Sequence, residues 1–433
     1  MKMTRRYFLQ ASGLAAAYCG LAPSLSLGNA ALPDDKLKQV TRKKTLVTIF
    51  LRGGMDGLNF VVPFGDPQYY AMRGSIAVPA PGMGSANLRT GNALDLDGFF
   101  GLHPNAAPLM PLFKSGQAAA LQAVGYSRNT RSHFEEQDTW ETGMIGNTIA
   151  SDGWLNRHLV TSKGNGVIRA VALGDTLPRI LRGQASAFAV RGITDLAMPG
   201  GALPPEAQAV MGAALEHAYK VDPKAAQPHA RQLLADSAMT TMEGIEQIKK
   251  VTATPYKPKA VYPKGKFGKQ LEDVARLIKA DIGLEVAEID YGGWDTHQNQ
   301  LNSYGNLVQG LADGIAAFCK DLEDRLDDVL VLTLSDFGRT AAENGTGGTD
   351  HGWANCMLAI GGPARKATGG SLKPVLGTWP GLAREKLYEK RDLAHTTDFR
   401  DVLGEVVSVH LGNDNLKTVL PGHTFKPVGL VSV

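Results

Sequence analysis

Six short apolar runs, each followed by glycine or polar residues, constrain most strongly how this chain folds. The first is "KTLVTIFLRGG" (44–54), in which β-branched residues lead directly into two glycines. A run of this kind is typical of a strand that is buried on both faces and ends in a tight loop. The same format recurs at 117–126, 166–174, 284–293, 328–338 and 356–362.

Helical patterns lie between several of these runs. Helices are expected at 269–282 and at 398–412, the second ended by Gly412. Strands that alternate with helices predict an α/β fold, with a mostly parallel sheet flanked by helices on both faces. The clearest helical pattern is an apolar stripe with spacings of three and four, formed by Leu307, Leu311, Ile315, Phe318 and Leu322.

Two stretches interrupt the alternation. Residues 73–100 are rich in glycine, proline and asparagine without a helical period, which suggests a hairpin excursion. Residues 203–265 hold alanine-rich helical sequence and then a proline- and lysine-containing loop, so we expect a helical insertion or lid there. The rest of 32–433 is expected to form one domain around the sheet.

Residues 1–31 predict a twin-arginine signal peptide. The paired Arg5 and Arg6 precede a mildly apolar stretch rich in alanine and glycine, and a small-residue cleavage site follows. An amphipathic helix would need a repeating polar face, which is absent, and a lipoprotein signal at Cys19 would not have the bulky Tyr18 before it. We therefore expect a periplasmic or secreted protein that uses the twin-arginine export machinery.

The charge balance excludes some partners. The signal peptide carries three of the 45 basic residues and no acid, so its removal leaves 42 basic against 42 acidic residues. No dense basic run remains, which argues against a nucleic-acid partner. No later apolar run is long enough to span a membrane.

Two cysteines, Cys319 and Cys356, remain after the signal peptide. Both lie in apolar patterns and are expected to be buried small hydrophobic residues. An oxidising compartment would permit a disulfide between them, which the sequence leaves open. Twin-arginine export carries folded proteins, often with a cofactor loaded, and this favours a metalloprotein.

Four polar clusters follow the strand-like runs. In open parallel sheets, ligands bind beyond the carboxyl ends of the strands, and the clusters fall there. In chain order, the clusters offer Asp56 and Asn59; Ser132 and His133; Asp295 and His297; and Asp336, Arg339, Asn344, Asp350 and His351.

Each cluster also has a simpler explanation. Asp56 lies between glycines and is a good turn former, and Ser132 is placed to cap the helix that it opens. Asp295 and His297 suit a solvated loop, and the glycines of 345–348 suit a flexible one. Four such loops leaving one edge of one sheet favour a shared site instead.

Aspartate and histidine together suit zinc, manganese or a similar divalent ion. Two ions held about 4 Å apart would clamp the attacking and leaving oxygens of a phosphoryl-type transfer. The helix that begins at Ser132 adds backbone donors for an anion. We predict one or two divalent ions, with zinc, manganese, calcium and magnesium as candidates.

Seven motifs carry a resemblance to a known family: "TRRYFL", "FLRGGMDGLNFVVPFGDPQYYAMR", "GLHPNAAPL", "RSHFEEQDTWETG", "GGWDTHQNQ", "SDFGRTAAENGTGGTDHG" and "TTDFRDVLGEVV". Through them the chain resembles, over nearly its whole length, an exported bacterial family. This family is catalogued as domain of unknown function 1501 and is grouped with the alkaline phosphatase and sulfatase superfamily. The resemblance implies an alkaline-phosphatase-like fold.

The resemblance also implies roles for individual residues. Ser132 is similar to the superfamily's nucleophile at a helix start. Metal-binding positions of the superfamily are matched by Asp56, Asp295, His297, Asp336 and His351.

Two departures from the superfamily pattern stand out. Phe337 follows Asp336 where a histidine is usual, so one metal position loses a nitrogen ligand. Asp350, His133 or Asn59 could compensate, or that position could be empty. The sulfatase signature of proline and arginine is absent after Ser132, so conversion of the nucleophile to formylglycine is not expected.

These observations predict an exported, metal-dependent hydrolase of phosphate or sulfate esters, acting on a small-molecule or polymer-borne anionic ester. Ser132 would be the nucleophile, and Arg339 would hold the anion's non-bridging oxygens or serve as a structural salt bridge. The alternative is a non-catalytic periplasmic binding or assembly protein that retains the fold, with or without a structural metal ion. The expected metal ligands are Asp56, Asp295, His297, Asp336, Asp350 and His351, with Asn59, His133 and Asn344 as additional candidates.

Overall fold

The computed structural model describes residues 43–83, 91–128, 130–146, 150–164, 166–194, 228–366 and 373–431. The predicted signal peptide (1–31) and the first part of the predicted insertion (203–227) lie outside the described residues. Within the described residues, the main sheet has nine strands, in the order β11-β5-β10-β9-β1-β8-β6-β7, with β12 also pairing with β5.

The strands are β1 (Thr45–Arg52), β5 (Ala118–Gly125), β6 (Ala170–Leu173), β7 (Phe188–Val190), β8 (Val286–Gly292), β9 (Val329–Ser335), β10 (Asn355–Gly361), β11 (Val375–Leu376) and β12 (Thr397–Asp398). All six predicted runs form strands of this sheet. β1 pairs in parallel with β8 and β9, and β6 pairs in parallel with β7 and β8, whereas β10 runs antiparallel to β5 and β9. The predicted α/β class with a mostly parallel sheet is confirmed.

The residues of β1 alternate between two cores. Val47 and Ile49 pack in one apolar cluster, and Leu46 and Phe50 pack in the other. A parallel strand covered on both faces reads as a continuous apolar run, because neither side of it meets water. For this reason the apolar run of β1 could be recognised in the sequence.

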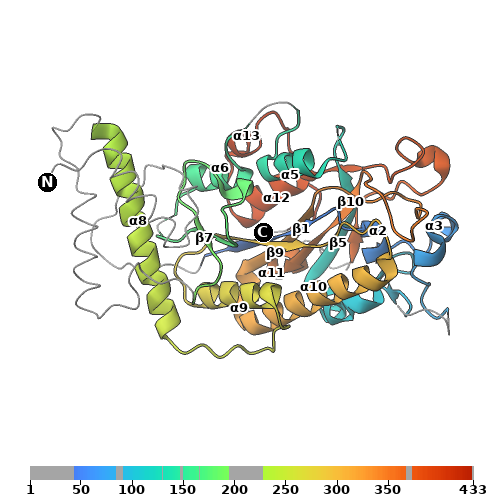
Figure 1. Ribbon diagram of the computed structural model, residues 1–433, viewed down its shortest axis with the longest axis horizontal. Helices are drawn as coiled ribbons and strands as arrows, with labels where there is room; N and C mark the ends of the chain where they lie inside the picture. Colours follow the sequence, from blue (N-terminus) through green and yellow to red (C-terminus); the bar gives the residue numbers. More distant parts are fainter. Residues whose placement is uncertain are drawn as a thin grey trace.

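Helices cover both faces of the sheet (Figure 1). α9 (Lys266–Lys279) and α10 (Gln300–Leu322) contribute to the core with Val47, and the stripe residues Leu311 and Ile315 are fully buried there. The opposite core takes side chains from α5 (His133–Thr142), α6 (Trp154–Thr161), α12 (Phe399–Glu405) and α13 (Leu416–Val419). A π-helical turn, Val406–His410, continues α12, and Gly412 follows in a left-handed conformation.

Smaller elements complete the described chain. The predicted excursion forms part of a three-stranded antiparallel sheet of β2 (Val61–Val62), β4 (Gly101–Leu102) and β3 (Leu94–Asp95). Within 203–265, α8 (Pro228–Ala253) is a long helix at one end of the molecule (Figure 1), where Ile248 joins the core with α9. The short helices are α2 (Gly57–Phe60), α3 (Pro67–Arg73), α4 (Met110–Lys114) and α11 (Gly362–Lys366).

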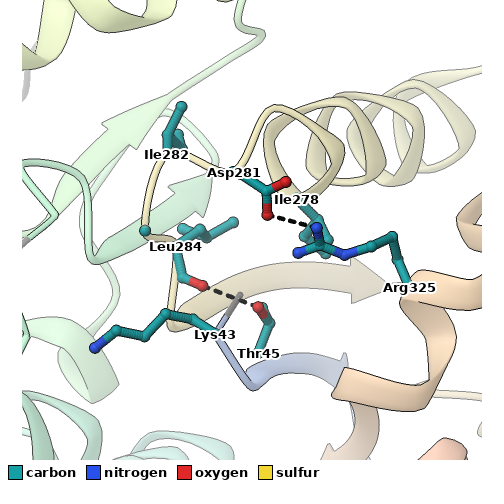
Figure 2. A pocket seen from close by; sticks show the side chains of 8 residues that line it. Lys43, Thr45, Ile278, Asp281, Ile282, Leu284 and Arg325 are labelled. Atoms are coloured by element: carbon teal, nitrogen blue, oxygen red, sulfur yellow. Dashed lines mark hydrogen bonds and ion pairs between the residues drawn. The ribbon is translucent and has the colours of Figure 1, made fainter. Parts of the chain in front are cut away.

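A cavity of about 10 Å³ lies at the amino end of β1, between this strand and the end of α9 (Figure 2). The Thr45 hydroxyl donates to the Leu284 carbonyl at 2.9 Å, and Arg325 pairs with Asp281 at 2.5 Å. A space of this size holds about one water molecule.

Two predictions about composition can be compared with the described chain. Cys319 and Cys356 are both buried, and neither forms a disulfide. None of the helices in the described residues combines the length and the apolar character that crossing a bilayer requires.

Candidate metal centre

Three histidines and one aspartate converge at the carboxyl edge of the sheet. The Nε2 atom of His351 lies 3.1 Å from Nε2 of His133 and 3.0 Å from Nε2 of His297. The Asp295 carboxylate lies 3.0 Å from Nε2 of His297, 3.2 Å from that of His351 and 3.6 Å from that of His133. His133, Asp295 and His351 each offer one ligand atom within 4.8 Å of the others.

These side chains come from three separate segments. His133 is the first residue of α5, and Asp295 and His297 follow β8. His351 lies in the loop between β9 and β10. The structure thus brings together Asp295, His297 and His351, which were predicted as ligands, with His133, which was an additional candidate.

The Nδ1 atom of each histidine faces an acceptor. Nδ1 of His133 lies 2.5 Å from the Asp336 carboxylate, and Nδ1 of His297 lies 3.0 Å from that of Asp350. Nδ1 of His351 lies 2.9 Å from the backbone carbonyl of Arg131. Carboxylates and carbonyls only accept, so each Nδ1 has a partner to which it can donate. A ring with its proton at Nδ1 presents a lone pair at Nε2, on the side that faces the Asp295 carboxylate.

That arrangement is unfavourable without a positive charge between the donors, and a divalent ion supplies one. At metal–ligand bonds of 2.0 to 2.2 Å, tetrahedral ligands lie roughly 3.3 Å apart. Among His133, Asp295 and His351 the separations are 3.1 to 3.6 Å, which bracket this spacing. Histidines oriented through Nδ1 by a carboxylate or carbonyl are also typical of metal sites. These three residues fit one divalent ion, and His297 lies 3.0 Å from both Asp295 and His351 as a further candidate ligand.

The pKa values of two ligands favour the forms that bind metal. Burial lowers the pKa of His351, which keeps its ring neutral. Burial alone would raise the pKa of Asp295, but the hydrogen bond and charge of Arg339 outweigh it and lower this pKa. For His133, the hydrogen bond to Asp336 raises the pKa, so that a metal at Nε2 would compete with a second proton.

Asp336 and Asp350 contact the Nδ1 atoms of His133 and His297, and not the Nε2 atoms that face Asp295. Asp336 is fully buried, and it also accepts from the Gln137 side chain at 2.9 Å and from the backbone N–H of Gly53 at 3.2 Å. These bonds, with the one to His133, hold the pKa of Asp336 low although burial alone would raise it. The structure thus gives both aspartates, predicted as direct ligands, the task of orienting His133 and His297.

Asn344 shapes the glycine-rich loop and does not reach the cluster. Its amide donates to the His297 carbonyl at 2.9 Å and to Asp350 at 3.1 Å, and its Oδ1 accepts from the backbone N–H of Gly348 at 3.1 Å. A Cβ at Gly348 would overlap the His297 carbonyl. The glycine is needed because the two ligand-bearing loops touch at this position.

Phe337, the residue after Asp336, lies against the cluster. Its buried ring centre is 4.7 Å from the ring centres of both His133 and His351. Gly54, at φ +68°, leaves room for this ring, since a Cβ there would come within 2.6 Å of it. The phenylalanine ring therefore forms an apolar contact surface beside His133 and His351. Of the residues expected to compensate for the lost nitrogen ligand, it is His133 that lies in the cluster.

Asp56, predicted as a metal ligand, has other partners. Its fully buried carboxylate forms an ion pair with the equally buried Arg73, which donates to it through both Nη atoms. The remaining contact is from Gln300, whose amide donates at 2.5 Å. Asn59 is likewise engaged, with the Ile76 carbonyl and the Tyr69 hydroxyl. Neither side chain contacts the histidine cluster, so we exclude both from the centre.

Gln300 connects Asp56 to the two ligand-bearing loops. Its Oε1 accepts from the hydroxyl of Thr296 at 3.0 Å and from that of Thr349 at 2.9 Å. Thr296 lies between Asp295 and His297, and Thr349 lies two residues before His351. A buried polar network at the start of α10 therefore sets how the two loops approach each other.

The guanidinium of Arg339 is used within the protein. It is 1% exposed and donates to the carbonyls of Gly53, Gly54, Trp294 and Thr349. It also pairs with Asp295 at 2.5 Å. This geometry corresponds to the structural alternative that the sequence had left open, and not to an arginine held ready for a substrate anion.

Ser132 immediately precedes His133, at the N-cap position of α5. Its side chain makes no capping hydrogen bond, unlike that of a serine whose role is to cap the start of a helix. The residue is half-buried and directly precedes His133 of the cluster.

Sequence reasoning missed Arg73, Gln300 and Gln137. Arg73 lies at the end of α3, where the sequence had suggested the start of an irregular excursion. Gln300 is the first residue of α10 and Gln137 lies in α5, and neither was singled out in the sequence. The spacing of a single sequence gives no signal that such side chains turn inward.

The fold and the site define an α/β protein with a candidate three-histidine, one-aspartate metal centre at the carboxyl edge of its sheet. The model of the family described as "Protein of unknown function (DUF1501)" matches residues 43–406. The chain belongs to this family. A comparison with curated protein sequences gave no match.

Solved structures show a distant similarity. The complex of Ps i-CgsB with k-i-k-neocarrahexaose is 12% identical at a TM-score of 0.37, over 87% of this chain and 74% of that one. An alkaline phosphatase superfamily protein from Vibrio parahaemolyticus is 12% identical at 0.31, over 83% and 69%. The PsFucS1 sulfatase from Pseudoalteromonas sp. is 14% identical at 0.31, over 74% and 62%.

Proposed function

We propose that this protein is an exported, metal-dependent hydrolase of phosphate or sulfate esters. The observation that carries the proposal is the clustering of His133, Asp295 and His351, whose ligand atoms lie within 4.8 Å of one another, with His297 3.0 Å from Nε2 of His351. With neutral histidines and one carboxylate, a divalent ion would leave the centre with a net positive charge that attracts an anionic ester. When bound, such an ion would act as a Lewis acid that stabilises negative charge on the ester oxygens. Zinc, manganese, calcium and magnesium are the candidates, and zinc suits this donor set best.

In this proposal the Ser132 oxygen forms a bond to the phosphorus or sulfur while the bond to the alcohol oxygen of the ester breaks. The alcohol leaves with the hydroxyl proton, and water then hydrolyses the ester on Ser132 to release the inorganic anion. The Ser132 side chain makes no capping hydrogen bond to α5, and the residue directly precedes His133 in the chain. Arg339 and Asp336 do not contact the ester: Arg339 lowers the pKa of Asp295, and Asp336 fixes the ring of His133. The apolar ring of Phe337 helps to exclude water from one side of the cluster.

The proposal is tested with p-nitrophenyl phosphate and p-nitrophenyl sulfate, using protein loaded separately with each candidate metal. Ser132→Ala should abolish turnover while metal content stays unchanged, and its effect on unfolding should stay within about 1 kcal/mol. Ser115→Ala, at the end of α4, is the matched control. Folded, metal-loaded protein whose turnover of both esters does not exceed that of Ser132→Ala contradicts the enzyme proposal.

One observation favours the second candidate, a non-catalytic binding or assembly protein. In the part of the chain that the structure describes, the cluster provides ligands for one ion, because Asp56 is committed to Arg73 and Asp336 to His133. A two-ion clamp on attacking and leaving oxygens is then missing. This candidate predicts metal binding and anion binding without turnover in the same assay.

A further inference from the structure

A second pocket opens at the same edge of the sheet, at the ends of β1 and β8. Its volume is about 510 Å³, and it is bounded by the start of α9 and by Gly310 of α10. Tyr291 and Gly292 line the pocket, and Asp295 of the metal centre follows three residues later in the chain. Between them, the ring of Trp294 lies edge-on to that of Tyr291 at 5.7 Å. None of the cluster residues lines the pocket, so the two sites are adjacent but separate.

The amino end of α9 faces this pocket. The N-cap residue is Gly265, which has no side chain to cap the helix, and the first turn contains no acid. The helix has 14 residues, so its uncapped N–H groups and its dipole favour an anion at this end.

The side chain of Gln270 is a second, independent sign of a ligand. This residue lines the pocket although it is only 2% exposed, and its Nε2 donates to the Leu173 carbonyl. Its Oε1 has no hydrogen-bond partner in the described part of the chain. A buried acceptor without a donor is costly, so a hydroxyl group of a ligand would stabilise it.

The pocket has a small excess of positive charge. Arg52, Lys264 and Lys266 line it with Asp290, and Glu141 also pairs with Arg52, so three cations face two carboxylates. Arg52 is held in place by Asp290 at its Nε and by Glu141 at its Nη1, both at 2.6 Å. Its Nη2 has no partner among the described residues, so it remains available for an anion.

The stacked rings of Phe267 and Tyr291 give the pocket a flat apolar side. Their centres lie 4.3 Å apart with the planes inclined by 22°. Such a surface packs against the carbon face of a ring-shaped ligand.

We propose that this pocket binds an anionic group that carries neighbouring hydroxyls, such as a sugar bearing sulfate or phosphate. The anion lies at the start of α9 with Arg52 and the two lysines, and a hydroxyl donates to Oε1 of Gln270. Together with the proposed function, on which this last step rests, the pocket points to a polymer-borne ester as the substrate. One unit of the polymer would reach the metal centre while the next occupies the pocket.

Calorimetric titration of the metal-loaded mature chain tests the pocket. The probes are glucose 6-sulfate, glucose 6-phosphate, glucose and inorganic sulfate. We expect Lys264→Gln/Lys266→Gln to bind both sugar esters about tenfold more weakly than wild type, since charge-assisted hydrogen bonds are lost. The matched control, Lys250→Gln/Lys257→Gln, changes the same charge at exposed lysines that do not line the pocket and should bind like wild type. Equal affinities of the two double variants would overturn the proposal.

The role of Gln270 is tested separately. Gln270→Met keeps the volume and removes the acceptor, so affinity for the sugar esters should fall while affinity for inorganic sulfate stays unchanged. If inorganic sulfate binds wild type as tightly as the sugar esters do, the pocket is an anion site only and the proposed recognition of hydroxyls is wrong. A preference for one of the two esters identifies the anion.

The outcome is separable from that of the proposed function. His351→Ala removes a ligand of the metal centre and leaves the pocket residues in place, so sugar-ester binding should persist in this variant. Binding that disappears with His351 belongs to the metal centre and overturns the pocket proposal. Turnover of p-nitrophenyl esters by a protein whose pocket binds no sugar ester would support the proposed function and contradict the pocket proposal.

Discussion

The acceptor at Nδ1 of each histidine of the candidate centre influences the orientation and the protonation of that ring. The acceptors at Nδ1 of His133, His297 and His351 are two carboxylates and a backbone carbonyl. They determine which nitrogen carries the proton and how the ring is turned. We therefore expect the metal affinity of the cluster to depend on these acceptors as well as on the ligands.

Asp350 allows this dependence to be measured, because its side chain is 53% exposed and its loss leaves no cavity. Asp350→Ala should weaken zinc binding by roughly 10- to 100-fold, as is usual for such partners. The unfolding temperature of the metal-free protein should stay unchanged. Competition with a chromogenic chelator gives the affinity, and Asp414→Ala, an exposed aspartate of α13's leading loop, is the control. Equal affinities in the two variants would contradict this role.

The sequence predicted some residues of the centre and not others. Asp295, His297 and His351 could be found because parallel strands bring their carboxyl ends together, so residues just after such strands become neighbours. Asp56 satisfies the same rule, but Arg73, which lies 17 positions later, pairs with it. That pairing depends on how α3 folds back, and no local pattern reports it. Which oxygen or nitrogen coordinates, and which only orients, is decided by ångström-scale geometry.

At the scale of elements, the strands were the most predictable part. A strand covered on both faces is mostly apolar, so β1 and β9 each left a nearly continuous apolar run in the sequence. β8 is interrupted by Glu288 and Asp290 and becomes exposed at its carboxyl end. The antiparallel direction of β10 could not be predicted from this signal. A strand buried on both faces gives the same apolar run whether it runs parallel or antiparallel to its neighbours. The buried ion pair of Asp56 and Arg73 was invisible for a related reason. Its partners belong to α2's leading loop and to α3, which pack together only in the folded protein.

This ion pair gives the next prediction. Asp56→Ala leaves the fully buried Arg73 charge without its carboxylate, which should lower the free energy of unfolding by about 3 to 5 kcal/mol. Urea denaturation of the metal-free protein measures the loss. Asp56→Leu/Arg73→Met removes both charges and should recover a large part of it. If Asp56 were a direct metal ligand instead, Asp56→Ala would retain most of its metal-free stability and the double variant would recover nothing.

At the scale of the whole molecule, the metal centre joins segments that are distant in sequence. Its ligands come from the start of α5, from the loop after β8 and from the loop after β9. The unfolded chain does not hold these residues together, so a bound ion should stabilise the folded state.

Metal removal should therefore lower the unfolding temperature. At a free metal concentration of about 1,000 times Kd, binding contributes about 4 kcal/mol, which corresponds to a shift of several degrees for a domain of this size. Calorimetry with and without a chelator measures the shift. His351→Ala is the control, since it should unfold at the same temperature in both conditions. A shift of the same size in His351→Ala would place the stabilising ion elsewhere.

The same long-range assembly bears on export, which we propose to follow the twin-arginine route. Ligands that lie between residues 133 and 351 form a site only after the chain has folded, and twin-arginine export is suited to folded proteins with a cofactor in place. Replacing Arg5 and Arg6 together by lysine keeps the positive charge of the signal and removes the guanidinium groups that the export receptor reads. The precursor should then accumulate in the cytoplasm, where cell fractionation and the size of the unprocessed chain reveal it. Replacing Lys2 by arginine is the control and should leave processing unchanged. A double variant that still reaches the periplasm in its processed form would show that another route exports the chain, and the argument that the metal is loaded before export would fall with it.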